Sequence, residues 1–512
     1  MSSITVPKES LREASASAVQ AKPRALSLDR VAFFTLLLLV PLVSLPYGTN
    51  DAWWVALMET AVFALAAVWL VDNWRDGAWL VPEHRLLLPL AALLVFAFIQ
   101  TIPFGSVTTA TGVATPQTIS ADPFETRRWI IEVGAYLLVT LLLLRYTSSP
   151  RRLRLLVYTI IATGVACSLL GILRQTAQRD AGFLIWMRLV RGVGYAQFIN
   201  RNHFAFLMEM ALGLLTGLIV AGGIKRERVI IFVAAALPLW AALVLTASRG
   251  GILTMFTQIV FIALMFGAVR PGDDHSSRSS SGGVAGALAR LSRSFAFRAT
   301  LVVCLLAMTL VGVMWIGGEQ LAARLGTTPG EGLSASNARE IVRQGAMREQ
   351  IWSATWELAK AHPFLGTGFN GYRVAITGHH DASGEASLQQ AHNDYLELLA
   401  GGGVLACALV LWFFVWLIKI ARRRLRSPDA FRRGACFGAL VALFGAAVHS
   451  VVDFGLHTGV NALVCAALVA VAVANNNVED RSALAPRKRR RRRSSSSLAH
   501  APKVDALSVG GE

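Results

Sequence analysis

Residues 229–269 read VIIFVAAALPLWAALVLTASRGGILTMFTQIVFIALMFGAV. Two long apolar runs flank a short polar bend, Ser248-Arg249-Gly250-Gly251. Each run has about the 20 residues that an α-helix needs to cross the hydrocarbon core of a bilayer. Because backbone polar groups in lipid must be satisfied within the segment itself, the stretch predicts two membrane-spanning helices joined by a tight bend.

The rest of the chain repeats this apolar pattern. Of 512 residues, 54% are hydrophobic and 16% are charged, whereas a soluble domain carries about 25% charged residues. This composition excludes a soluble globule and a disordered chain, and only five cysteines exclude a disulfide scaffold. We predict an all-α, polytopic integral membrane protein of about 12 transmembrane helices, with ten or fourteen as alternatives. The apolar runs lie at 30–47, 51–71, 85–104, 128–145, 153–173, 203–222, 229–247, 250–269, 299–318, 395–418, 434–452 and 458–474.

The basic residues indicate how the chain is oriented. With the N-terminus placed in the cytoplasm, most of the 49 Lys and Arg residues fall in cytoplasmic segments, as the positive-inside rule requires. Both termini are therefore predicted to be cytoplasmic. The predicted division is an N-terminal tail (1–29), nine spans (30–318), a large external loop (319–394), three spans (395–474) and a basic C-terminal tail (475–512).

The C-terminal tail contains seven consecutive basic residues, Arg487 to Arg493. Such a run is compatible with nucleic-acid binding. It is equally typical of a solvated cytoplasmic tail that fixes orientation and contacts anionic membrane lipid. We favour the second interpretation and expect no nucleic-acid partner.

The external loop 319–394 is far longer than an ordinary connection, so local structure or function is expected there. Apolar residues recur at helical spacing from Met347 to Leu358, which predicts an amphipathic helix over 337–362 that lies at the membrane interface and ends at Pro363. The following segment 365–372 is glycine-rich. It is expected to be either an ordinary turn or a nest of backbone N–H groups that binds an anion.

Two residues at the outer ends of the spans are candidates for chemistry. Arg249 has almost no loop around it, and Arg costs about 2.5–3.5 kcal/mol at the centre of a span. It is therefore either a snorkelling side chain or an anion ligand in a recessed external cavity. Arginine forks match phosphate oxygens, and a histidine such as His392 can accept a proton near neutral pH. Together they suggest transfer from a lipid diphosphate sugar, with arginines stabilising the leaving group and His392 as general base.

Neither a metal nor another cofactor is expected. The chain has no Asp-x-Asp pair for a metal–nucleotide complex, and the neighbouring side chains of His379-His380-Asp381 diverge. Other polar residues have a structural and a functional interpretation that both stay open. Glu209 lies within a predicted span, and His449 and Asp453, one helical turn apart, are expected to pair directly. The possible cavity-lining residues are Arg201, His203, Glu209, Arg343, His449 and Asp453.

Several short motifs resemble the bacterial O-antigen ligase/polymerase superfamily of membrane glycosyltransferases. The resemblance covers most of the membrane region and is strongest over 340–475. It rests on the order and spacing of its parts more than on any one of them. These parts are Phe198-Ile199-Asn200-Arg201-Asn202-His203, Ser248-Arg249, Arg348-x-x-x-Trp352, Pro363-Phe364-Leu365-Gly366-x-Gly368, His392-Asn393-x-x-Leu396-x-x-Leu399-x-x-Gly402 and His449-Ser450-x-x-Asp453-Phe454.

The resemblance implies the integral-membrane glycosyltransferase fold in the bacterial inner membrane, with the active site facing the periplasm. It implies an undecaprenyl diphosphate-linked glycan as donor, used without nucleotide or metal. Arg249 and Arg348 would bind the donor diphosphate, and His392 would activate the acceptor hydroxyl, with inversion at the anomeric carbon. The chain departs from the pattern at Ala400–Gly403, where an acidic residue is expected before the glycine; glycines there are expected to loosen the helix.

The acceptor is not evident from the motifs. Ligation to lipid A-core is ranked slightly ahead of polymerisation on another lipid-linked glycan, and protein O-glycosylation comes third. A transporter of lipid-linked saccharide is the alternative from another class. A transporter is expected to hold its charged residues near the midplane, whereas a transferase should bring Arg249, Arg348 and His392 into one outward-open pocket.

Overall fold

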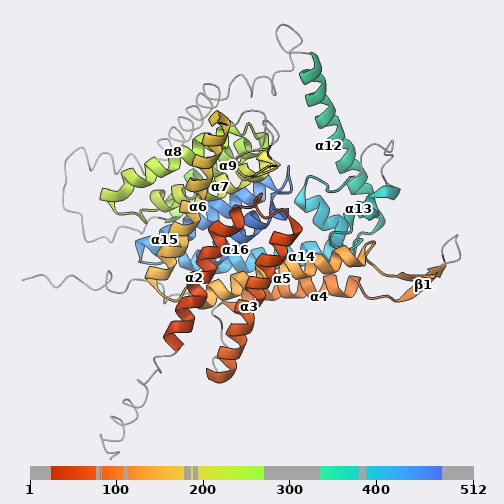
Figure 1. Cartoon of the computed structure of the whole chain (residues 1–512), viewed down its shortest axis with the longest axis horizontal. Helices are drawn as coiled ribbons and strands as arrows, with labels where there is room; N and C mark the ends of the chain where they lie inside the picture. Colours follow the sequence, from red (N-terminus) through yellow and green to blue (C-terminus); the bar gives the residue numbers. More distant parts are fainter. Residues whose placement is uncertain are drawn as a thin grey trace, which may run out of the picture.

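The computed structural model describes residues 25–76, 81, 83–108, 114–177, 186–187, 189, 194–269, 335–379 and 388–474. Figure 1 shows their helices packed into one bundle, from which α12 and the β1–β2 hairpin extend to one side. The predicted class, an all-α polytopic membrane protein, is confirmed for this part of the chain.

The long helices follow the apolar runs of the sequence. They are α2 (Ala25–Ser44), α3 (Ala52–Asp76), α4 (Leu88–Gln100), α5 (Pro123–Tyr146), α6 (Pro150–Ala177), α7 (Arg201–Val220), α8 (Val229–Leu245), α9 (Arg249–Val269), α12 (Ala335–Ala361), α14 (Asp394–Arg424), α15 (Ala430–His449) and α16 (Gly459–Val473). Short helical turns are η1 (His84–Leu87), η2 (Arg226–Arg228), α13 (Tyr372–Ala375), η3 (Ile376–Gly378) and η4 (Gly455–His457).

Each predicted span coincides with one of these helices except 299–318, which lies outside the described residues. Within the described ranges, six helices are long and apolar enough to cross a membrane: α3, α5, α6, α7, α14 and α15. The apolar helices that begin at η1, α8, α9 and α16 are shorter. The count of twelve spans and the division into tails, spans and loop therefore stay predictions.

Helices α7 and α15 form the centre of the bundle, and small residues let their backbones approach closely. A Cβ built on Gly217 would lie 2.5 Å from the Cα of Gly438. A Cβ on Gly438 would lie 2.3 Å from the carbonyl oxygen of Leu214. Close backbone contact through small residues is the usual way in which helices associate within lipid, where burial of apolar surface gives no driving force.

Basic residues collect at one end of the bundle. Arg152 forms an ion pair of 2.6 Å with Asp29 at the start of α2, and Arg424 at the end of α14 pairs with Glu83. Arg432 is fully buried and donates to the carbonyl oxygens that end α16, those of Val471 and Ala474. Because α14 runs from Asp394 to Arg424, this basic end lies opposite the end where α14 begins. The orientation of the bundle in the membrane stays a prediction.

The segment between α4 and α5 contains a small hairpin that the sequence did not predict. Strand β1 (Gly105–Thr108) pairs antiparallel with β2 (Ala114–Gln117), with Gly105 opposite Gln117. Four-residue strands are too short to show a clear alternation of apolar and polar residues, so a sequence pattern has little to detect.

The predicted amphipathic helix is confirmed as α12, but its apolar stripe is covered by protein. Ile351, Ala354 and Leu358 are buried, and the last two pack in a cluster with Tyr372, Ile376, Ala391 and Ala400. The burial of this stripe therefore requires no lipid. The position of α12 at a membrane interface stays a prediction.

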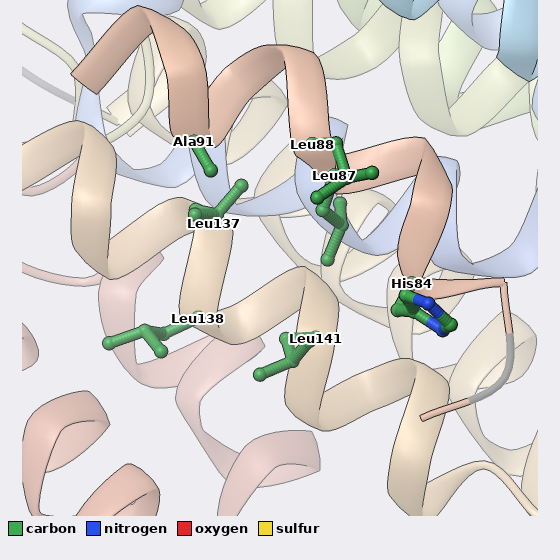
Figure 2. A pocket seen from close by; sticks show the side chains of 7 residues that line it. All are labelled: His84, Leu87, Leu88, Ala91, Leu137, Leu138 and Leu141. Atoms are coloured by element: carbon green, nitrogen blue, oxygen red, sulfur yellow. The ribbon is translucent and has the colours of Figure 1, made fainter. Parts of the chain in front are cut away.

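An apolar pocket lies between η1–α4 and α5, at the basic end of the bundle. Figure 2 shows leucine side chains on both walls and the His84 ring at one end. The Nδ1 of His84 lies 3.0 Å from the carbonyl oxygen of Val81, close to the Glu83–Arg424 pair. Since His392 lies at the opposite end of α14, this pocket is separate from the candidate site.

Candidate functional site

His392 is held immediately before the first turn of α14. The side chain of Asn393 caps this helix by accepting hydrogen bonds from the N–H groups of Tyr395 and Leu396, at 3.0 and 3.1 Å. A capping residue satisfies backbone donors that the first turn leaves unpaired. The cap fixes where α14 begins and leaves His392 in the segment just outside it. His392 has φ 51°, in the left-handed region that residues with a side chain rarely adopt.

A buried carboxylate faces the His392 ring. The Nδ1 of His392 lies 3.7 Å from Oδ1 of Asp453, whose side chain is 2% exposed, whereas the His392 side chain is 35% exposed. Burial alone would raise the pKa of Asp453, but the surrounding imidazoles of His392, His203 and His449 and the N–H of Phe454 hold it below its ordinary value. Asp453 therefore keeps its negative charge at neutral pH beside a ring that remains open to solvent.

The predicted pairing of His449 with Asp453 is wrong. His449 instead directs Nδ1 at both carboxylate oxygens of Glu209, at 3.0 Å each, and both side chains are almost completely buried. Pairing at a spacing of four residues needs a helix that continues through both positions. Helix α15 ends at His449, and the chain then turns, so that Asp453 faces His392.

The Glu209–His449 pair joins α7 to α15 and leaves a tight space for α9. A Cβ built on Gly250 would lie 2.6 Å from Nε2 of His449 and 3.0 Å from a methyl group of Val452. Glycine at the start of α9 therefore lets this helix approach the end of α15. The preceding residue, Arg249, is exposed and is thus carried to the segment that contains Asp453.

His203 lies on the other side of a shared aromatic ring. The Phe454 ring is 4.7 Å from the His392 ring and 4.8 Å from the His203 ring, edge to face in both cases. The Nδ1 of His203 lies 2.7 Å from Oγ1 of Thr458, and its side chain is mostly buried. His203 thus supports the site from inside the bundle. Arg201, the first residue of α7, is half-buried at the same end.

Arg348 reaches the site through α12. One turn after Arg348, the indole N–H of Trp352 donates a 3.0 Å hydrogen bond to the carbonyl oxygen of Ala391, the residue before His392. Arg348 itself is half-buried. Both candidate arginines therefore lie on helices that contact the immediate surroundings of His392. That their side chains share one outward-open pocket with His392 stays a prediction. The side chain of Arg343 lies outside the described residues.

A second histidine–carboxylate group lies beside the first and was missed from the sequence. The Nε2 of His457 lies 3.5 Å from Oδ1 of Asp394 and 3.8 Å from Oε1 of Glu397. Burial alone would lower the pKa of His457, but these two carboxylates raise it above its ordinary value. The available signal was the pair of acidic residues in the first turn of α14, but nothing in the sequence indicated that His457 faces them.

The glycine-rich loop after α12 is a packing element, which contradicts the anion-nest alternative. The N–H groups of Gly366, Thr367 and Gly368 donate to the carbonyl oxygens of His362, Ala400 and Gly401 at 2.9–3.1 Å. These donors are therefore used within the protein.

The glycines of α14 that were expected to loosen the helix serve this same contact. Gly403 has φ 61°, and a Cβ on it would lie 2.4 Å from the carbonyl group of Phe364. The Gln100 side chain donates to the carbonyl oxygens of Leu365 and Gly401, which ties α4 to the contact. Helix α14 is interrupted at Gly403, whose φ/ψ of 61° and −164° are non-helical, so the expectation of a loosened helix is confirmed there. Glycine is required at this kink because two backbones approach closely.

Replacing Gly366 with alanine should lower the free energy of unfolding by roughly 2–4 kcal/mol, from backbone strain and overpacking. Gly366 has φ 65°, and a Cβ there would lie 2.3 Å from the carbonyl carbon of Gly401. Thermal unfolding of the detergent-solubilised protein measures the effect. Gly378→Ala is the matched control, because a Cβ on Gly378 meets nothing within 4 Å. Equal unfolding temperatures for the two variants would contradict the packing role.

In the part of the chain that the structure describes, no group of three His, Cys, Asp or Glu side chains is placed to hold a metal ion. Of the adjacent residues considered from the sequence, His379 is exposed, and His380 and Asp381 lie outside the described residues.

Comparison with protein families gives the chain its class. Residues 230–411 match the family described as O-antigen ligase. This match supports the resemblance of the chain to the O-antigen ligase/polymerase superfamily. The match therefore confirms the predicted resemblance. Members of this superfamily are membrane glycosyltransferases that use lipid-linked glycans and acceptor substrates. No curated protein matches the chain.

The O-antigen ligase match contains part of the candidate site only. Arg249, Arg348 and His392 lie inside the matched residues. His203 lies before the match and Asp453 after it, and the three-dimensional contacts alone bring them to His392.

Proposed function

We propose that this protein transfers a glycan from undecaprenyl diphosphate to an acceptor hydroxyl at the periplasmic face of the bacterial inner membrane, without a metal ion. The observation that carries the proposal is the buried Asp453 carboxylate facing the half-exposed His392 ring, 3.7 Å away. A buried acid that orients a histidine, with the second ring nitrogen directed elsewhere, is a general-base arrangement.

The reaction assigns each ring nitrogen a role. Since Nδ1 of His392 faces Asp453, Nε2 is the nitrogen available to the acceptor hydroxyl. As the acceptor oxygen bonds to the anomeric carbon, the bond from that carbon to the diphosphate oxygen breaks, with inversion. The hydroxyl proton passes to Nε2, and Asp453 stabilises the imidazolium that forms. The departing diphosphate keeps the electron pair and needs stabilisation by positive charge.

Arg249 and Arg348 supply that positive charge in our proposal. A guanidinium stays charged at any working pH and presents parallel N–H donors to phosphate oxygens. Both residues lie on helices that contact the surroundings of His392, through Gly250 against His449 and through Trp352 on Ala391. Arg343, one further turn away from Trp352, is the weaker candidate.

Arg249→Ala should raise the KM for the lipid-linked donor about 10-fold or more, because hydrogen bonds to charged groups contribute about 1.5–3 kcal/mol. Initial rates of purified enzyme at varied donor concentration measure this. Arg249→Lys keeps the charge but loses the fork, so partial recovery is expected. Arg373→Ala removes an exposed arginine of α13 and serves as control. An unchanged donor KM for Arg249→Ala would leave Arg249 as a snorkelling side chain.

Ligase and polymerase share this chemistry and differ in the acceptor. We place ligation to lipid A-core or a similar glycolipid first, polymerisation second and protein O-glycosylation third. Complementation decides between the first two: hosts lacking either their own ligase or their own polymerase receive wild type or His392→Ala. Restored surface polymer in the ligase-deficient host alone supports ligation. Restored long chains in the polymerase-deficient host alone would make the protein a polymerase.

A further inference from the structure

Both backbone polar groups of Ala391, the residue before His392, are held by side chains from different helices. Ala391 is completely buried, and its N–H donates to Oε2 of Glu397 on α14 at 3.0 Å. Its carbonyl oxygen accepts the 3.0 Å hydrogen bond from the indole N–H of Trp352 on α12. Both polar groups of a buried backbone unit are thus satisfied by side chains, although backbone groups in proteins bond mostly to one another.

The residue that follows needs such support. His392 adopts φ 51°, an unfavourable conformation for a residue with a side chain, which persists only where the surroundings impose it. On its other side, Asn393 caps α14, and the N–H of Asp394 donates to the carbonyl oxygen of Ser450 at 2.9 Å. Bonds from α12, α14 and the end of α15 therefore fix the backbone on both sides of His392. The direction of its ring follows from that backbone.

We propose that Trp352 and Glu397 are positioning residues for His392: they clamp the backbone of Ala391 on both sides of its Cα and so direct the imidazole between Asp453 and the acceptor. The proposal rests on the proposed function, since it assigns the clamp to the general base. It also gives α12 two tasks. The helix carries Arg348 to the donor and, one turn later, holds the base through Trp352.

Docking of α12 does not depend on the indole N–H. Ile351 and Leu358 are buried, and Oγ1 of Thr355 lies 2.7 Å from the hydroxyl of Tyr372. Replacing Trp352 with phenylalanine keeps a six-membered aromatic ring and removes the indole N–H donor together with the five-membered ring. The helix should stay docked with Arg348 in place, while the Ala391 carbonyl is released.

The test is steady-state transfer by the purified full-length protein, with donor concentration varied. Trp352→Phe should lower kcat about 10-fold with donor KM unchanged within twofold, since small displacements of a catalytic group cost rate and not donor binding. Trp356→Phe, one turn later on α12 and 49% exposed, is the matched control and should match wild type. A wild-type kcat for Trp352→Phe would overturn the proposal. So would a fall in kcat accompanied by a raised donor KM and a lower unfolding temperature, because that pattern indicates displacement of the whole helix.

The second clamp residue gives an independent measurement if Trp352→Phe does not accumulate. Glu397→Gln keeps an acceptor oxygen for the Ala391 N–H, whereas Glu397→Ala does not. The clamp predicts that kcat falls for the alanine variant and is largely retained by the glutamine variant; equal loss in both would overturn it. Combined with Trp352→Phe, Glu397→Ala should give a less than additive effect, because both act on the backbone of one residue, Ala391. An active His392→Ala would instead refute the proposed function and leave the clamp without a base to position.

Discussion

Replacing His392 with alanine should abolish glycan transfer while the folded protein accumulates as the wild type does. A positioned general base contributes about 10²–10⁴-fold in rate. The carboxylate that faces His392 is 2% exposed, whereas the two carboxylates that face His457 are 15% and 11% exposed. The ring is 35% exposed, so its removal leaves little cavity and should have a small effect on stability. Transfer by purified protein and surface-polymer restoration in cells measure the first effect, and thermal unfolding measures the second.

The matched control is His362→Ala, which removes an exposed histidine from the segment that follows α12. It should transfer glycan at the wild-type rate. If His392→Ala transfers as fast as wild type, the assignment of His392 as the base is wrong. If the variant fails to accumulate, His392 has a structural role that its partial exposure does not indicate.

The helices could be predicted from the sequence because crossing a bilayer is largely a property of composition and length. A run such as 229–247 has to satisfy its own backbone in lipid, so its helix needs no knowledge of its neighbours. Helix α8 covers Val229–Leu245, and α9 begins at Arg249, within a few residues of the prediction. The β1–β2 hairpin was missed because its stability comes from pairing between two very short strands.

The contacts of the site were less predictable because they join distant parts of the chain. Glu209 and His449 are 240 residues apart, and no local sequence pattern around either residue indicates the other as its partner. The rule that residues four apart on a helix are neighbours predicted a pair of His449 with Asp453 instead. This prediction failed because α15 ends at His449. A shift of one or two residues at a helix end decides which way a side chain points, and this is the feature that sequence patterns give least well.

The roles of the glycines in the 365–372 loop and in α14 were also hard to predict from the sequence. Glycine permits an anion nest, a turn or a close approach of two backbones, and the sequence is the same in each case. Only the structure distinguishes these three possibilities: a Cβ placed on Gly366 would lie 2.3 Å from the carbonyl carbon of Gly401. The position of the site therefore depends on packing between distant segments of the chain. Residue types and their local spacing do not predict this packing.

The carboxylate behind the base gives the second large effect. Asp453→Asn preserves size and shape and removes only the negative charge that faces His392. A charge-assisted contact contributes about 1.5–3 kcal/mol, so kcat should fall roughly 10–100-fold. Transfer by the purified variant measures this, with Glu357→Gln as control, since Glu357 on α12 is 55% exposed and lies away from the site. A kcat within twofold of wild type would show that Asp453 does not support the base.

The same substitution has a pH signature in stability. The folded protein holds the pKa of Asp453 below its ordinary value of about 4, because the surrounding imidazoles outweigh the effect of burial. The ionised carboxylate therefore stabilises the fold above the unfolded pKa, and this contribution is lost as pH falls through the folded pKa. The difference in unfolding temperature between wild type and Asp453→Asn should accordingly decrease as pH falls below about 4. A difference that stays the same below about pH 4 would mean that the folded protein does not lower the pKa of Asp453, and the carboxylate would then not be held in the charged form that stabilises an imidazolium on His392.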